Sequence, residues 1–394
     1  MSNGREVVIV SGVRLAIGGF GGSLSGLAPT ETGAMVIKEA LKRADIAPSE
    51  VGHVVIGHVV NTEPKDMYVS RVAAVGAGVP IETPAMNVNR LCGSGAQAIV
   101  SATQAILLGE CDVAVAGGAE TMSRSPHSTQ TIRTGQKMGD TKFTDMMIGA
   151  LTDPFGAGHM GITAENVAAK HGIDRAAQDA FALESQRRAA VAIKEGRFKD
   201  QILPIEVKVG REMKVFDTDE HPKATTAESL SGLKPAFKKD GSVTAGNASG
   251  INDGAAAVVL MERSAAEKAG KKPMARIVGY AHAGVEPSIM GIGPVPAVQK
   301  LMEKTGLKIT DFDVIESNEA FAAQACAVAQ ELGMPADKVN PNGGAIALGH
   351  PIGATGAIIT VKCMYELART GGRYGLVTMC IGGGQGIALA IERM

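Results

Sequence analysis

The chain has 394 residues, with 39 Lys and Arg against 40 Asp and Glu, so its formal net charge at pH 7 is −1. A chain this close to neutral has no global field to recruit nucleic acid or an anionic membrane, and we expect neither as a partner. The 5 cysteines include no Cys-x-x-Cys pair, which argues against a disulfide framework and against structural zinc. We expect no metal, no membrane span and a cytoplasmic location, because no apolar run looks long enough to cross a bilayer and a strand follows the N-terminus at once.

Strand-like and helix-like segments alternate in the first third of the chain. Continuous apolar runs predict buried strands, and apolar residues at helical spacing predict helices. The expected strands cover residues 6–11, 50–60 and 111–118, and the expected helices cover residues 30–44, 68–76 and 93–109. This alternation is typical of an α/β sheet with helices on both faces.

The C-terminal third repeats this order at an offset of roughly 260 residues, far longer than a solenoid period, which indicates a duplicated domain. The matching segments are strands at 275–281, 311–321 and 374–380, a helix at 296–304, and a turn with its helix at 339–368. In this half, the strand 374–380 turns directly into the strand 386–393. In the first half the equivalent strands, 111–118 and 254–263, are separated by a long excursion.

The excursion predicts a subdomain inserted at a hairpin tip. It carries two candidate helices, residues 163–171 and 175–195, and a charged stretch at 208–239 that we expect to be mobile. The predicted parts are one α/β half from residues 1–120 with 251–272, an inserted loop domain from 121–250, and a second half from 273–394.

Cys92 lies in the stretch NRLCGSG, between a short extended segment at residues 84–89 and a helix. The free N–H groups and the dipole of a helix N-terminus favour a thiolate, which is the nucleophilic form of cysteine. The alternative interpretation is a small buried residue at a tight turn.

Three further positions are candidates because equivalent strand ends of duplicated halves come together, and ligands bind at such ends. His350, in ALGHPIG, would face Cys92 as a base, or else cap a helix. Cys380 begins the glycine turn CIGGGQG, whose N–H groups could stabilise an oxyanion, or which could be an ordinary hairpin. Asn318, in SNEAF, ends a strand and could be a plain helix cap.

The motifs NRLCGSG, SNEAFAAQ, GGAIALGHPIGATG and CIGGGQG, in this order and spacing, resemble those of the thiolase family of acetyl-CoA acyltransferases. The resemblance covers essentially the whole chain. It implies a duplicated, five-layered αβαβα fold with an inserted loop domain, an acyl-enzyme mechanism, and acetyl-CoA, acyl-CoA and CoA as substrates with no separate cofactor. It also implies a homotetramer, in which the polar segment 123–145 takes part in assembly.

The resemblance assigns roles to the candidate residues. Cys92 would be the nucleophile, His350 its base, and Cys380 the acid and base that moves the α-proton of acetyl-CoA. Asn318 would hold a water in the oxyanion hole that His350 shares, and the N–H groups of Cys92 and Gly382 would form the other oxyanion hole.

The resemblance also implies a set of residues around coenzyme A and the acyl group: Leu151, His159, Met160, Lys223, Phe237, Ala245, Ser249 and Ala320. One departure concerns the nucleotide end, where the family commonly has an arginine and this chain has Lys223 in a shortened loop. Lysine lacks the planar fork that supports bidentate or stacked contacts. His159 and Met160 resemble those of enzymes that act on short acyl chains.

Three rival functions follow from the same residues. A condensing enzyme related to ketoacyl-ACP synthases or hydroxymethylglutaryl-CoA synthase is the nearest rival, and Cys380 favours a thiolase over it. A catalytically silent CoA-binding protein and a cysteine hydrolase are the others, and thiolysis and hydrolysis assays would distinguish them.

Overall fold

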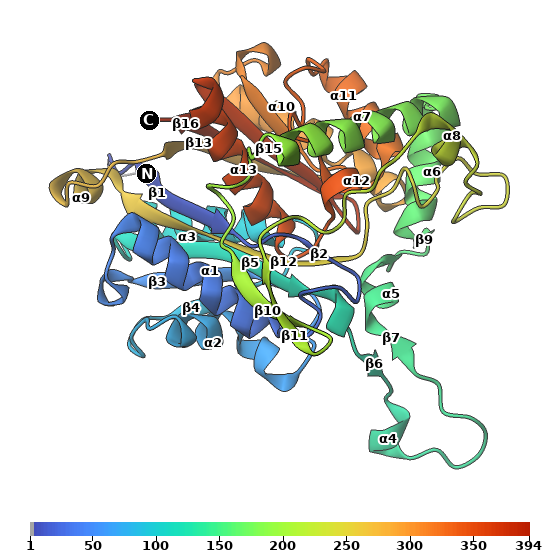
Figure 1. The fold of residues 1–394 in the computed structure, drawn as a ribbon, viewed down its shortest axis with the longest axis horizontal. Helices are drawn as coiled ribbons and strands as arrows, with labels where there is room; N and C mark the ends of the chain where they lie inside the picture. The colour runs from blue at the N-terminus through green and yellow to red at the C-terminus, as the bar shows by residue number, and fades with distance from the viewer. Residues whose placement is uncertain (1–3) are drawn as a thin grey trace.

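The computed structural model describes residues 4–394, and a ten-stranded mixed sheet runs through the molecule (Figure 1). One half of the sheet consists of β1 (Val7–Arg14), β12 (Asn252–Glu262), β5 (Val113–Thr121), β3 (His53–Gly57) and β4 (Ala85–Val88), with β2 (Gly18–Gly19) beside β12. The other half consists of β13 (Ala275–Gly284), β16 (Gln385–Arg393), β15 (Tyr374–Ile381) and β14 (Val314–Ser317). The halves join where β1 pairs with β13, Val8 opposite Arg276 and Ile9 opposite Ala275.

Helices form three layers around the two halves of the sheet. The outer layers are α1 (Pro29–Ala44) and α2 (Val69–Gly76) on the first half, and α10 (Pro294–Thr305) and α11 (Ala322–Leu332) on the second. Between the two halves lie α3 (Ser94–Leu108) and α13 (Thr355–Thr370), which contact strands of both. The duplicated five-layered fold expected from the sequence is confirmed.

The central helices approach each other backbone to backbone at a pair of equivalent glycines. A Cβ on Gly95 would lie 2.6 Å from the backbone nitrogen of Ala357, and a Cβ on Gly356 would lie 2.3 Å from that of Ala96. Only glycine permits this distance, so the sequence pattern of the two turns sets how closely the two halves approach.

The inserted region leaves the sheet after β5 and returns at β12, and these two strands pair from Thr121 opposite Asp253 onward. It contains α4 (Thr131–Thr134), α5 (Met146–Ala150), α6 (Met160–His171), α7 (Arg175–Lys194) and α8 (Ala227–Ser231). Its strands are the short pairs β6 (His127–Ser128) with β7 (Thr144–Asp145), β8 (Thr152–Asp153) with β9 (Gly158–His159), and β10 (Ile205–Val209) with β11 (Glu212–Phe216). Two more helices lie outside it: α9 (Arg263–Lys268) between the halves and α12 (Ala345–Leu348) before α13.

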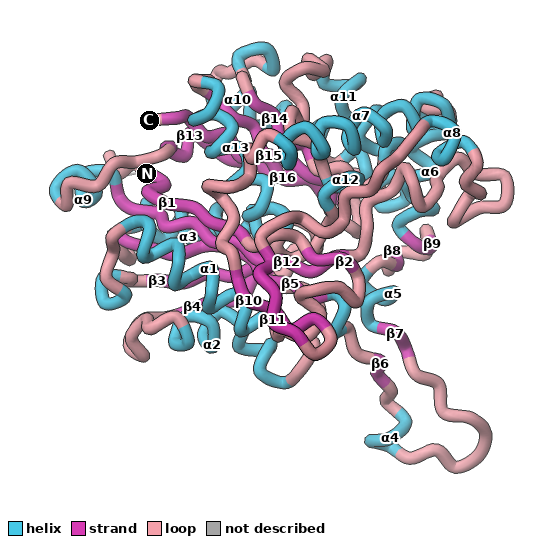
Figure 2. The backbone as a smooth tube through the Cα atoms, viewed as in Figure 1, coloured by secondary structure: helices cyan, strands magenta, loops and turns pink. Residues whose placement is uncertain are grey.

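The charged stretch 208–239, which we expect to be mobile, contains regular elements, because the β10–β11 hairpin and α8 lie in or overlap it (Figure 2). The strands expected at 50–60 and 311–321 are shorter than predicted and reduce to β3 and β14. After β3 the N–H groups of Val59 and Val60 bond to the Glu120 side chain instead of a neighbouring strand. In the second half one bridge between Ile315 and Val339 occupies the place of β4.

One 18-residue window, Leu91–Leu108, does reach the length and apolar character of a membrane span, contrary to the expectation. In the structure this window is α3 with the turn before it. It lies in the central layer, where its apolar side chains pack against strands of both halves of the sheet, and Ala98, Ile99 and Ile106 are fully buried.

Candidate active site

A cavity of about 380 Å³ opens where the ends of the strands and the inserted region meet. Cys92, His350 and Gly382 line it. All the residues predicted for the coenzyme and acyl group also line it: Leu151, His159, Met160, Lys223, Phe237, Ala245, Ser249 and Ala320. Cys380 and Asn318 do not reach the cavity wall but lie buried next to residues that do. The structure therefore brings the residues predicted from distant motifs together.

A strained turn positions Cys92. Leu91, just before it, has a φ of 46°, a left-handed conformation that a branched side chain rarely adopts. Hydrogen bonds hold the turn: Leu91 N–H donates to Asn89 Oδ1 at 3.0 Å, and Ser94 Oγ donates to Leu91 O at 2.6 Å and accepts from Arg90 N–H at 2.9 Å. The turn aims the Cys92 thiol at the cavity while α3 starts behind it.

The resting state of Cys92 differs from the prediction of a thiolate. Gly93 is the N-cap of α3, so Cys92 lies just before the helix as predicted, but burial raises the pKa of the Cys92 thiol to about 11. The backbone N–H of Gly382 and that of Cys92 lower this pKa, but burial outweighs them. The prediction that the helix N-terminus keeps Cys92 as a thiolate is wrong, because desolvation has the larger effect on its pKa. Cys92 is therefore a neutral thiol near pH 7 and would need a base to become a nucleophile.

His350 is suited to be that base. Its Nδ1 lies 2.7 Å from Thr355 Oγ1, and its Nε2 lies 3.4 Å from Asn318 Nδ2. Burial lowers the pKa of His350 to about 4, so the imidazole is neutral near pH 7. The backbone of the turn is fixed as well, because His350 N–H donates to Asn252 Oδ1 at 2.9 Å.

The glycine turn after Cys380 lies against the Cys92 turn. A Cβ on Gly93 would lie 2.5 Å from Ile381 Cδ1, and a Cβ on Gly382 would lie 3.2 Å from both Leu91 and Met160 side chains. Burial raises the pKa of the Cys380 thiol well above its ordinary value, and charge on Cys92 raises it further. Both thiols are therefore neutral near pH 7, and the backbone N–H of Gly382 lowers the pKa of Cys92.

The inserted region supplies most of the apolar wall. The rings of His159 and Phe237 stack with centroids 4.8 Å apart, and Phe237 meets Phe321 edge-on at 6.1 Å. His159 Nδ1 accepts the N–H of Gly161 at 3.1 Å, and burial lowers the pKa of His159, so this ring is neutral too. An uncharged, aromatic wall suits a flexible, largely apolar arm of a ligand.

Lys223 and His221 mark one side of the cavity. Lys223 is exposed, and its N–H donates to Gln186 Oε1 at 3.1 Å. Burial and the charge of Lys223 lower the pKa of His221 to about 4. The sequence analysis did not single out His221, since nothing in the shortened loop distinguishes it.

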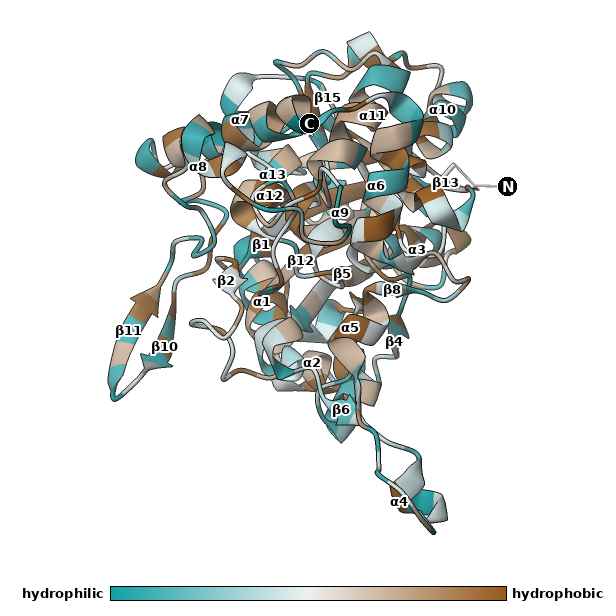
Figure 3. Cartoon of the chain, turned by 90° about the vertical axis from the view of Figure 1, so that its right-hand side faces the viewer, coloured by the Kyte–Doolittle hydropathy of each residue, from teal (hydrophilic) through white to brown (hydrophobic). Residues whose placement is uncertain are grey.

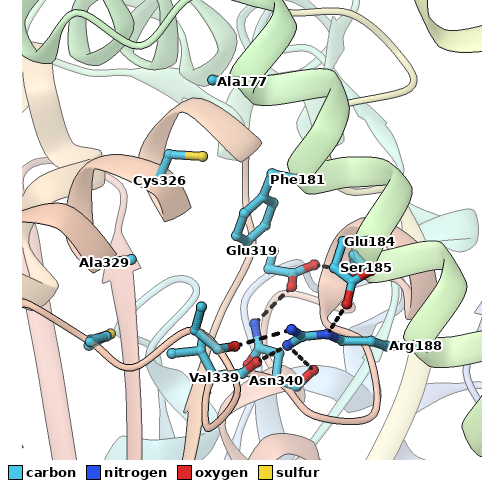
Figure 4. A pocket seen from close by; sticks show the side chains of 12 residues that line it. Ala177, Phe181, Glu184, Ser185, Arg188, Glu319, Cys326, Ala329, Val339 and Asn340 are labelled. Atoms are coloured by element: carbon cyan, nitrogen blue, oxygen red, sulfur yellow. Dashed lines mark hydrogen bonds and ion pairs between the residues drawn. The ribbon is translucent and has the colours of Figure 1, made fainter. Parts of the chain in front are cut away.

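A second cavity of about 400 Å³ lies between α7 and α11 and shows how the Asn318 turn is supported (Figure 4). Glu319 lies at its edge, and its carboxylate accepts hydrogen bonds from Ser185 Oγ at 2.7 Å, Asn340 Nδ2 at 2.8 Å and the N–H of Ile346 at 3.2 Å. Arg188 donates to Glu184 at 2.7 Å and to backbone carbonyls of the facing loop. These charges are satisfied within the chain, so they stabilise the strand end that carries Asn318.

Thr355, whose hydroxyl contacts His350, was not among the residues predicted from the sequence. The duplication could have revealed it, because Thr355 in ATGA occupies the place of Ser94 in GSGA. Ser94 Oγ accepts the N–H of Arg90, and Thr355 Oγ1 lies 2.7 Å from His350 Nδ1, so each hydroxyl bonds to the turn before its helix.

A neutral thiol, a neutral imidazole and backbone N–H donors around one apolar cavity define a cysteine-dependent acyltransferase on a duplicated α/β fold. Family models described as "Thiolase, N-terminal domain" and "Thiolase, C-terminal domain" match residues 7–264 and 271–393. The chain is 62% identical over 393 residues, 99% of its length and 100% of the relative's, to the beta-ketothiolase BktB of Cupriavidus necator.

Solved structures agree with the sequence comparison. The Bacillus anthracis acetyl-CoA acetyltransferase has a TM-score of 0.97 at 48% identity, with 99% of each chain covered. Human mitochondrial 3-ketoacyl-CoA thiolase in complex with CoA has a TM-score of 0.96 at 45% identity, covering 99% of this chain and 98% of that one. The chain belongs to the thiolase family.

Proposed function

We propose that this protein is an acetyl-CoA C-acyltransferase that condenses acetyl-CoA with an acyl-CoA, or cleaves a short 3-ketoacyl-CoA with CoA, through an acyl group on Cys92. The observation that carries the proposal is the single apolar cavity lined by Cys92, His350 and Gly382. The names of the relatives, beta-ketothiolase and acetyl-CoA acetyltransferase, support it.

In the first half-reaction, His350 takes the thiol proton of Cys92 as the sulfur attacks the thioester carbonyl of the acyl-CoA. The neutral state of both groups makes this a general-base step. The N–H groups of Cys92 and Gly382 stabilise the oxyanion, and the C–S bond to coenzyme A breaks. The departing sulfur takes the proton of Cys380, which leaves Cys380 as a thiolate.

In the second half-reaction, the Cys380 thiolate removes an α-proton from acetyl-CoA. The negative charge that develops on the thioester oxygen is stabilised by His350, which by then carries a proton, and by a water held by Asn318. The carbanion attacks the acyl carbon on Cys92, and the new C–C bond releases Cys92, which regains its proton from His350. The proton that Cys380 gives to the departing CoA is replaced by the α-proton of acetyl-CoA, and the proton of Cys92 returns to it from His350. Cys92, His350 and Cys380 therefore end as they began, and the written steps use only CoA thioesters and the chain's own residues.

The inserted region would hold the pantetheine arm of CoA, with Phe237, Ala245, Ser249 and Ala320 along the cavity. Lys223 would meet a phosphate at the nucleotide end as a single exposed charge, which is a weak contact. The solved complex of the human relative with CoA supports a CoA site in this fold.

A thiolysis series tests the proposed function. Acetoacetyl-CoA and longer 3-ketoacyl-CoAs are incubated with CoA, and loss of the 3-ketoacyl absorbance is followed. We expect acetoacetyl-CoA to be cleaved and the rate to fall as the acyl chain lengthens, because bulky side chains such as Met160, Leu151 and Met122 border the space near Cys92. No cleavage of any member would contradict the proposal, and acyl-CoA hydrolysis without an acceptor would support the rival cysteine hydrolase.

We further propose a cytoplasmic homotetramer. The segment 123–145 forms an arm that extends away from the body, with α4 near its tip (Figures 1 and 3). Ile132, Met138 and Phe143 on this arm are 76%, 86% and 57% exposed, and exposed apolar side chains of this size favour contact with another chain. Light scattering that finds a stable monomer at micromolar concentration would contradict the tetramer.

A further inference from the structure

Glu120 is a buried carboxylate near Cys92 that the mechanism above does not use. It is the next-to-last residue of β5 and has no exposed surface. Its oxygens accept N–H groups from Val59 at 3.0 Å, Val60 at 3.1 Å and Gly353 at 2.9 Å. Burial raises the pKa of Glu120, and these three hydrogen bonds offset part of that effect.

The three donors come from both halves of the molecule. Val59 and Val60 follow β3 of the first half, whereas Gly353 belongs to the turn of the second half that begins at His350. A Cβ on Gly353 would lie 2.3 Å from Glu120 Oε2, so only glycine allows this approach. Glu120 therefore connects the turn that carries His350 to the half of the molecule that carries Cys92.

The segments that Glu120 connects are the ones that pack around Cys92. Val60 is one of the three donors, and Ile352 comes directly before the donor Gly353. Their side chains belong to a buried apolar cluster against which Cys92 packs. A displacement of either segment would change the surroundings of the thiol directly.

The loop after β3 is fixed from its other side as well. His58 Nδ1 lies 2.9 Å from Ala119 O and 3.3 Å from Glu120 Oε1. Asp66, also fully buried, accepts the N–H of Thr62 at 2.6 Å and that of Glu63 at 3.1 Å. The loop is thus rigid, and Glu120 has a firm anchor in the first half.

The charge of Glu120 also acts on Cys92. The groups that influence the thiol are the N–H of Gly382, its own N–H and the carboxylate of Glu120, with the thiol of Cys380 and the imidazole of His350 close to it. Of these, Glu120 is a negative charge that raises the pKa of Cys92, in the same direction as burial. Removal of that charge should make the thiolate easier to form.

We propose that Glu120 is a positioning residue for acyl transfer, which ties the His350 turn to the Cys92 half of the molecule. This inference rests on the proposed acyl-enzyme function. Glu120 touches no reacting atom and acts through the segments that it connects.

Two substitutions distinguish the effect of the length of the Glu120 side chain from the effect of its charge. Glu120→Gln keeps the size but loses the charge and turns an NH₂ group toward an N–H donor. We expect kcat for acetoacetyl-CoA thiolysis to fall at least about tenfold, since small displacements of reacting groups cost this much or more. KM should stay within about threefold, because Glu120 does not line the substrate cavity. The pH profile of Cys92 alkylation by iodoacetamide, followed by mass spectrometry without substrate, should shift to lower pH.

Glu120→Asp keeps the charge but shortens the side chain, so kcat should fall while the alkylation profile stays near that of the parent. If Glu120→Gln does not fold, Glu120→Asp alone decides, and a parental kcat in it would overturn the proposal. Glu366→Gln is the control, because Glu366 is buried and bonded to Asn342 at 2.7 Å but lies on α13 away from the cavity wall.

We expect the Glu366→Gln control to lower the unfolding temperature and to leave kcat and the alkylation profile unchanged. A parental kcat in Glu120→Gln would overturn the inference. A parent protein without thiolysis activity would instead contradict the proposed function, while the alkylation profiles would still report on Glu120.

Discussion

The imidazole of His350 is oriented by the hydroxyl of Thr355, since Nδ1 and Oγ1 are 2.7 Å apart and both are buried. The same hydroxyl donates to the carbonyl of Pro351 at 2.8 Å, so toward His350 it can only accept. The proton of the neutral imidazole therefore resides on Nδ1, and Nε2, next to Asn318, is the nitrogen free to take a proton.

Replacement of Thr355 by valine should impair this orientation without changing the volume of the side chain. We expect kcat for thiolysis to fall by about ten- to a hundredfold, in line with the contribution of a well-placed general base, with a small change in KM. Steady-state kinetics with acetoacetyl-CoA measures it. Thr355→Ser retains the hydroxyl and is the matched control, and a valine variant as active as the serine variant would refute the role of Thr355.

Substitutions of Cys92 and Cys380 should block different steps of the proposed reaction. Cys380→Ser should still form the acyl-enzyme on Cys92 from acetyl-CoA, because that half-reaction breaks no C–H bond and CoA can depart as a thiolate, although without the Cys380 proton the step should be slower. It should not exchange the α-protons of acetyl-CoA with deuterated water, since a hydroxyl is a far weaker acid and base than a thiol in this range. Intact-protein mass spectrometry and NMR exchange measure the two steps, with Cys92→Ala as the comparison. Exchange retained while acylation is lost in Cys380→Ser would reverse the assignment.

Lys223→Ala should raise KM for CoA by roughly two- to fivefold with little change in kcat, because one exposed charge contributes about 1 kcal/mol or less. The difference from the parent should shrink at high ionic strength, where exposed charges are screened. Lys268→Ala, an exposed lysine of α9 that does not line the cavity, is the control. A salt-independent effect, or an equal effect in the control, would argue against a phosphate contact.

Much of the fold could be predicted from the sequence because the chain repeats itself. The shared pattern of extended segment, glycine turn and helix around Cys92 and His350 predicts that both turns start central helices, as α3 and α13 do. The interruption between β5 and β12 exposes the inserted region in the same way. Apolar periodicity carries no information on the β10–β11 hairpin, whose strands are mostly exposed.

The site was predictable as a set of residues but not in its electrostatics. Motif positions indicated which side chains meet at the cavity. They could not show that burial outweighs the N–H donors at Cys92, nor that Glu120 and Thr355 approach the two turns, because both effects depend on packing between halves far apart in sequence.

Asp253 provides a test of the electrostatics through stability. Burial raises the pKa of Asp253 to about 6 from its ordinary value of 3.8, and its Oδ2 has no partner among the described residues. Between these values the folded protein binds the proton and the unfolded chain does not, so this group's contribution to stability is lost as pH rises through about 6.

Above pH 7, Asp253→Asn should therefore unfold at a higher temperature than the parent, and its free energy of unfolding should be larger by an amount on the order of 2 kcal/mol. This difference should vanish near pH 4. The asparagine can still accept the N–H of Ser123, now at 2.9 Å from Oδ1. Calorimetry across this range, with Asp337→Asn on an exposed loop as the control, measures the difference. A pH-independent difference would show that Asp253 is not destabilised by its charge.

If Cys92 carries the acyl group, peptide mass spectrometry after brief incubation with acetyl-CoA should detect it there. We expect one acetyl group on the peptide that contains Cys92, its loss when CoA is added, and no acetylation in Cys92→Ser, which should still bind CoA. Acetylation of Cys380 in the parent, or full thiolysis activity without any acetylated Cys92, would rule out Cys92 as the nucleophile.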